Sequence, residues 1–179
     1  MFRLLNLYEY ELSRKQEIIE MMFYSLTAFL IPMLLSHPQY LVGTVVNFLL
    51  IISAMNIKGY KLLPVIVTPS LGALIHGALF GPFTVFLIYM IPFIWIGNII
   101  LVYSFKYFKL NKKINYWTVL LIGSVLKAGF LFLMAYILYY LNLVPALFLT
   151  VMSTIQLITV ISGGIIAFWA NKIHIFINT

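Results

Sequence analysis

The chain has 179 residues, of which 64% are hydrophobic and only 8% are charged, and its mean hydropathy is +1.08. A soluble domain carries roughly 25% charged residues, so this composition excludes a soluble globular domain and predicts a single-domain integral membrane protein. The net charge is +7, but the basic residues are scattered at the ends of apolar runs, which excludes a nucleic-acid-binding face. The absence of Cys excludes disulfides and thiolate chemistry.

Residues 1–13 mix apolar and charged side chains and are predicted to form a short cytoplasmic or interfacial arm. Residues 14–172 are predicted to form one transmembrane domain, and residues 173–179 a cytoplasmic tail. Each of the six apolar runs in the domain is close to the ~20 residues that cross a ~30 Å hydrocarbon core. The runs cover residues 21–35, 40–57, 62–80, 83–105, 116–141 and 146–170. The predicted fold class is therefore an all-α membrane protein, a six-transmembrane-helix bundle.

Local signals refine two of these segments. Ser13 and Gln16 fit a capping box, which predicts that the first helix begins near Arg14. In the third segment, Ala73, Gly77 and Gly81 are spaced by four residues, so we expect them to share one packing stripe on a helix that continues to Phe80. A Gly-Pro corner at residues 81–82 then leads into the fourth segment.

The basic residues alternate between connections. The N-terminal arm carries three, the connection after segment two carries two, the connection after segment four carries four, and the C-terminal tail carries one, whereas the odd-numbered connections carry none. By the positive-inside rule, this alternation predicts that the N- and C-termini are both cytoplasmic and that the chain crosses the membrane six times. The four lysines after segment four are expected to form the most basic loop.

Lys127 is the one basic residue that falls inside a predicted segment. Its side chain lies too near mid-membrane to reach either surface easily, so it is either a neutral, packed or snorkelling lysine or part of a ligand site facing the bundle interior. No Asp or Glu lies within the apolar runs, so its partner is expected to be a bound anion, Asn47, Gln156 or backbone carbonyls.

Further polar side chains within the apolar runs are candidate ligand-binding residues or interhelical hydrogen-bonding groups. The candidate binding residues are His76, Lys127, Gln156, Asn47, Thr159 and Asn98. His76 has only His37 as a possible partner on the outer side, so no metal site is predicted. Thr159, Gly163 and Ala167 form a small-residue stripe that is expected to serve helix packing.

The sequence contains no phosphate loop, no GxSxG and no HExxH, and no nucleophile is paired with a base. The chain is therefore not predicted to be an enzyme, and no cofactor is expected.

Several stretches taken together resemble the substrate-binding (S) components of energy-coupling factor transporters, and an uncharacterised subgroup in particular. They are the Gly77–Phe83 corner, the Ile91–Asn98 stretch with its Pro, Gly and Asn, Lys127, and the Met152–Gly164 stretch with Ser153 and Gln156. The resemblance covers about residues 62–168. The sequence departs from that family in its short connection after the first helix and in lacking an Ala-xxx-Ala stripe on that helix.

The resemblance implies a bundle in a prokaryotic plasma membrane that captures a small, micronutrient-type solute from the outer side for ATP-driven uptake. Its partners would be a transmembrane coupling subunit and ATPases, besides the lipid bilayer and an anionic or polar solute. The solute would lie near His76 and the Gly81–Pro82 turn, with Lys127 and Gln156 at its floor.

An alternative is a non-transporting membrane scaffold related to the rod-shape protein of cell-wall synthesis, in which Lys127 and Gln156 would serve only helix packing.

Overall fold

The computed structural model describes residues 2–10, 12–35, 38–77 and 81–178, and every regular element within them is a helix. The predicted all-α class is confirmed. The α-helices are α1 (Phe2–Leu5), α2 (Arg14–Leu34), α3 (Gln39–Asn56), α4 (Leu63–His76), α5 (Leu87–Ser104), α6 (Tyr116–Tyr140), α7 (Leu147–Thr150) and α8 (Gln156–Asn178). Two 3₁₀ turns, η1 (Gly59–Leu62) and η2 (Gly81–Phe86), and two π-helical stretches, η3 (Phe105–Asn111) and η4 (Val151–Ile155), connect or extend them.

In the described part of the chain, five helical spans are long and apolar enough to cross a membrane. They are Arg14–Leu34, Gln39–Asn56, Phe83–Asn111, Tyr116–Tyr140 and Leu147–Ile173. The remaining long helix, α4, has 14 residues and extends only about 21 Å at ~1.5 Å per residue. These dimensions are those of a multi-pass membrane protein.

The first helix begins as the sequence predicts. Ser13 accepts a hydrogen bond from the Gln16 backbone N–H at 3.3 Å, and the Gln16 side chain accepts one from the Ser13 N–H at 3.0 Å. This reciprocal capping box satisfies two N–H groups that a helix start leaves without intrahelical partners.

The third segment ends earlier than predicted. Gly77 lies in the left-handed region at φ 72° and closes α4 after His76, so Ala73, Gly77 and Gly81 do not share one helical stripe. Glycine takes this conformation without the steric cost that a Cβ would add, which makes it a helix terminator. The expected continuation to Phe80 falls on residues 78–80, outside the described residues.

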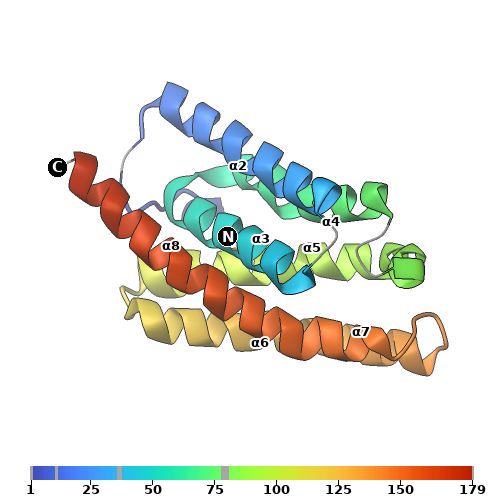
Figure 1. Cartoon of the computed structure of the whole chain (residues 1–179). Helices are drawn as coiled ribbons and strands as arrows, with labels where there is room; N and C mark the ends of the chain where they lie inside the picture. The colour runs from blue at the N-terminus through green and yellow to red at the C-terminus, as the bar shows by residue number, and fades with distance from the viewer. Residues whose placement is uncertain (1, 11, 36–37, 78–80, 179) are drawn as a thin grey trace.

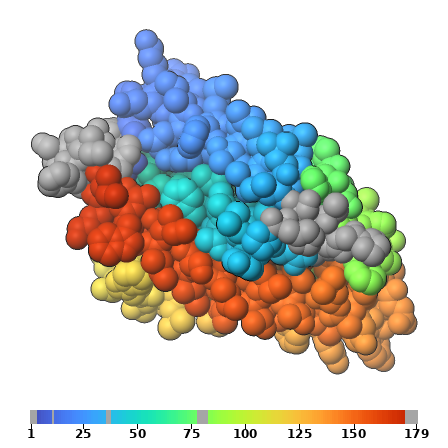
Figure 2. All heavy atoms as spheres, viewed as in Figure 1, coloured from blue at the N-terminus to red at the C-terminus, as the bar shows by residue number. Residues whose placement is uncertain are grey.

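Close glycine contacts pair the helices. A Cβ built on Gly72 of α4 would lie 2.1 Å from the Phe29 carbonyl oxygen of α2, and one on Gly163 of α8 would lie 2.6 Å from the Thr44 carbonyl oxygen of α3. Figure 1 shows the resulting bundle, and Figure 2 shows α2, α3 and α8 side by side across one face. The predicted packing role of the stripe at residues 159, 163 and 167 is confirmed, because Thr159 and Ala167 are buried as well.

The interior divides into two apolar clusters. One contains Met55, Phe105 and Tyr116 and fills the end where the basic connections lie. The other contains Met90 and Phe148 and surrounds the opposite half of the bundle. The candidate site lies in this second half.

Candidate functional site

A cavity of about 100 Å³ lies between α2, α3, α4, α5, α6 and the η4–α8 segment. It extends from Lys127, midway along α6, to Gln39, the half-buried first residue of α3. Much of its wall is apolar, including Val42, Ile94 and Met152. Its polar lining residues are Gln39, Asn47, Ser70, Asn98, Lys127, Gln156 and Thr159.

Lys127 is the only charged side chain among those lining residues, and it is 2% exposed. Its Nζ donates hydrogen bonds to Asn47 Oδ1 of α3 at 2.6 Å and to Asn98 Oδ1 of α5 at 2.8 Å. In the described part of the chain no carboxylate pairs with it. The ammonium group is thus partnered by neutral amides on two neighbouring helices. Asn47 is one of the partners that were expected from the sequence.

The two asparagines extend this network to two further helices. Asn98 Nδ2 donates to the Ile66 carbonyl oxygen of α4 at 2.9 Å, and Asn47 Nδ2 donates to Thr159 Oγ1 of α8 at 3.0 Å. Thr159 Oγ1 donates in turn to the Gln156 carbonyl oxygen at 3.1 Å. One connected set of polar contacts therefore fixes five helices around the cavity wall.

Gln156 provides the unsatisfied polar group of the site. Its Oε1 is buried and has no hydrogen-bond partner among the described residues. Unpaired buried polar atoms are rare in folded proteins and call for an explanation such as an absent ligand or water. Gln156 also follows directly on η4, and π-helical stretches are frequent at functional sites.

The structure brings five of the six predicted site residues together. Asn47, Asn98, Lys127, Gln156 and Thr159 all line the cavity. His76 does not line it: its Nδ1 pairs with the Met33 carbonyl oxygen, where the end of α4 meets the end of α2. His37 lies outside the described residues.

Sequence reasoning missed Ser70, which also lines the cavity and accepts a 2.7 Å hydrogen bond from Trp95 Nε1. The spacing of Ser70 from its neighbours in the sequence could have indicated that it faces the cavity. Ile66, Ser70 and Ala73 follow one another at helical spacing, so α4 presents all three on one face, and that face lies toward the cavity and Asn98.

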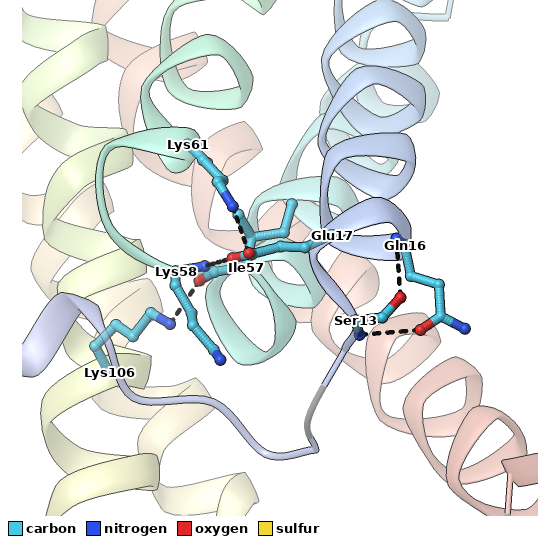
Figure 3. A network of polar contacts seen from close by, with 7 residues as sticks. All are labelled: Ser13, Gln16, Glu17, Ile57, Lys58, Lys61 and Lys106. Carbon is cyan, nitrogen blue, oxygen red and sulfur yellow. Dashed lines mark hydrogen bonds and ion pairs between the residues drawn. The ribbon is translucent and has the colours of Figure 1, made fainter.

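A second buried lysine lies at the basic end of the bundle, where the sequence analysis expected a loop. Lys106 belongs to the π-helical stretch η3, so its assignment to a loop was wrong, and its side chain is 0% exposed. Its Nζ donates to the Ile57 carbonyl oxygen at 2.8 Å (Figure 3). It also donates to the Leu7 carbonyl oxygen. These bonds bring the end of α3 and the N-terminal arm onto η3, which extends α5.

Ion pairs strengthen the same end. Glu17 pairs with Lys61 Nζ at 2.5 Å and accepts a hydrogen bond from the Lys58 backbone N–H at 2.7 Å (Figure 3). Glu9 of the arm lies 3.6 Å from Lys109 Nζ. Burial raises the pKa of the Tyr10 phenol above its ordinary value, so this arm residue stays neutral. Two ion pairs, Glu17–Lys61 and Glu9–Lys109, therefore lie at the basic end of the bundle, whereas none is described for Lys127.

Comparison with known protein families, with curated proteins and with solved structures gave no match. The cavity itself is therefore the feature from which a function can be inferred. The polar groups of the cavity are amides, two hydroxyls and an ammonium, which bind a ligand by hydrogen bonds and charge.

Proposed function

We propose that the chain is a membrane-embedded solute-binding subunit that captures a small anionic or polar solute. The observation that carries this proposal is a cavity within the bundle that is lined by two unusual side chains. Lys127 is buried and has no described carboxylate partner, and the buried Gln156 Oε1 has no described hydrogen-bond partner. Buried ionisable groups in membrane proteins are costly and commonly mark ligand or ion paths.

The proposed topology has six crossings with both termini in the cytoplasm. α4 would cross together with η1 before it and the residues that follow it. Contacts among Leu7, Ile57 and Lys106 support this arrangement, because they gather the arm and two basic connections at one end of the bundle. The positive-inside rule then assigns that end to the cytoplasm of a prokaryotic cell. The cavity would lie in the outer half, on the side from which solute arrives.

In the transport scheme that the sequence resemblance implies, a transmembrane coupling subunit and separate ATPases supply the energy, and this chain supplies specificity. The stripe at residues 159, 163 and 167 is buried against α3 and is not free to dock such a partner. Docking would therefore use another surface.

A non-transporting scaffold is the second candidate. The observation that favours it is that Lys127, Asn47, Asn98 and Thr159 already form a connected network across five helices without a ligand. In a scaffold this network would serve only to fix the helices.

Mass spectrometry of small molecules released from the purified protein separates the two. We expect the wild-type protein to release one enriched compound and Lys127→Met to release none. Lys106→Met is the matched control, because it removes a buried lysine that does not line the cavity and should retain the compound. Equal release, or none, from all three proteins would favour the scaffold.

A further inference from the structure

The hydrogen-bonding groups that remain free around Lys127 define a ligand class more narrowly. We propose that the cavity takes a small organic monoanion, with one carboxylate-like head on Lys127 and a compact apolar body. This inference rests on the solute-binding function proposed above.

The contacts of Lys127 determine how the Asn47 and Asn98 amides are oriented. An ammonium group has three N–H donors and no acceptor, so the oxygens of Asn47 and Asn98, and not their NH₂ groups, must face Lys127. The two NH₂ groups accordingly point toward Thr159 Oγ1 and the Ile66 carbonyl oxygen.

Several hydrogen-bonding groups around Lys127 have no described partner. Lys127 uses two of its three N–H donors, and each asparagine uses one of its two. Within the part of the chain that the structure describes, one N–H on each of the three side chains therefore has no partner. The unpaired acceptor in the cavity wall is Gln156 Oε1. A wall with more free donors than acceptors suits a ligand rich in acceptors.

The charge of Lys127 also bears on the class of ligand. The chain has four acidic residues, all at or before Glu20, and the described ion pairs of Glu9 and Glu17 lie at the basic end. Among the acidic residues that the structure describes, Glu9, Glu17 and Glu20, none pairs with Lys127. A buried charge without a partner is strongly unfavourable, and a ligand carrying one negative charge would balance it.

The cavity also limits the size and polarity of the rest of the ligand, its body. The remaining wall includes Val42, Val46, Leu87, Ile94 and Ile155, around a volume of about 100 Å³. A dry apolar cavity of roughly 150 Å³ holds benzene. This cavity is smaller, so the body is smaller than an aromatic ring and of short branched-chain size. An inorganic anion without an apolar body would not contact these apolar side chains. A dianion would carry one more negative charge than Lys127 can balance.

The test is a head-group series on a constant body. Isobutyrate, isobutyramide and isobutylamine are titrated against the wild-type protein in nanodiscs at pH 7 by calorimetry, with sodium chloride alone as a fourth probe. We expect isobutyrate to bind at least tenfold more tightly than isobutyramide, and isobutylamine and chloride not to bind. Because the wild-type protein carries the comparison, the test does not depend on the folding of any variant.

Two variants locate the effect. Lys127→Met should remove the preference for isobutyrate over isobutyramide. Asn171→Leu should keep it, because this substitution removes a buried amide with an unpaired Oδ1 from the same helix as Gln156 but outside the cavity wall.

Isobutyramide binding as tightly as isobutyrate would overturn the monoanion assignment and leave the solute-binding function standing. Chloride competing with isobutyrate at equal affinity would overturn the apolar body. No binding by any probe would also overturn the inference, whereas the solute-binding function itself fails only if the purified protein releases no compound.

Discussion

Two lysine side chains are fully buried in this bundle, and their surroundings differ. Lys106 donates to two backbone carbonyl oxygens at a helix end, a common way to satisfy both a cation and the final carbonyls of a helix. Lys127 donates to two side-chain amides beside a cavity. The first is a structural arrangement, and the second leaves a donor available to a ligand.

Replacing Lys127 with Met should reduce ligand affinity about 10- to 100-fold, because a hydrogen bond to a charged group contributes about 1.5–3 kcal/mol. The variant should still fold, with the free energy of unfolding lowered by about 1–3 kcal/mol by the unpaired Asn47 and Asn98 oxygens. Ligand titration and thermal unfolding in nanodiscs measure the two effects. Unchanged affinity would exclude Lys127 from the site.

Replacing Lys106 with Met should give the opposite pattern. Loss of both carbonyl contacts should lower the free energy of unfolding by about 1–3 kcal/mol, and ligand affinity should remain that of the wild type. The same two measurements apply. A loss of affinity equal to that of Lys127→Met would mean that the two ends of the bundle are coupled.

Gln156→Leu tests the unpaired oxygen. It breaks no described side-chain hydrogen bond, so stability should change by less than about 1 kcal/mol, whereas ligand affinity should fall. Asn171→Leu serves as the control on the same helix, with no expected change in affinity. If Gln156→Leu lowers the unfolding temperature and spares affinity, Gln156 contributes to packing and not to the site.

At the scale of elements, the contacts between helices depend on glycines that have no room for a side chain. Gly163→Ala places a Cβ 2.6 Å from backbone atoms of α3 and should destabilise the protein by about 1–3 kcal/mol, as overpacking does. Gly129→Ala on α6 is the matched control, because nothing lies within 4 Å of its Cβ. Equal unfolding temperatures for the two variants would contradict the close α3–α8 contact.

The apolar runs predicted most helices well, because long apolar segments bounded by polar turns leave few alternatives in a membrane. Two elements departed from prediction for local reasons. Gly77 ends α4 through a left-handed residue, which spacing alone does not reveal. Lys106 continues the helical span after Ser104 because carbonyl groups on two distant segments partner its ammonium group.

The site was predictable where polar residues interrupt apolar runs, as Asn47, Asn98, Lys127, Gln156 and Thr159 do. Their pairing was not, because sequence spacing does not fix how helices rotate against one another. His76 was expected beside the ligand for its position near a helix end, and it is bonded to α2 instead. Ser70 was overlooked because a serine in an apolar helix usually bonds its own backbone, as Ser70 also does with the Val67 carbonyl oxygen at 3.0 Å.

At the scale of the whole molecule, the basic end is filled by packed apolar side chains and ion pairs, and the opposite half contains the cavity. This asymmetry fits a binding subunit that receives solute from one side. It also makes the topology directly testable, because the chain has no native Cys.

Single cysteines at two exposed positions report the orientation. Asn111→Cys at the basic end should react with a membrane-impermeant maleimide only after cells are broken open, whereas Leu141→Cys at the opposite end should react in intact cells. Reaction of both positions in intact cells would show that the number of crossings between them is even, which contradicts the proposed arrangement.

The central expectation is that the cavity beside Lys127 holds a solute. Native mass spectrometry of the wild-type protein, ejected from nanodiscs without added ligand, measures this directly. We expect a mass increment of one small anion in the wild-type protein and in Lys106→Met, and none in Lys127→Met. The bare chain mass in all three, or the same increment in all three, would contradict it.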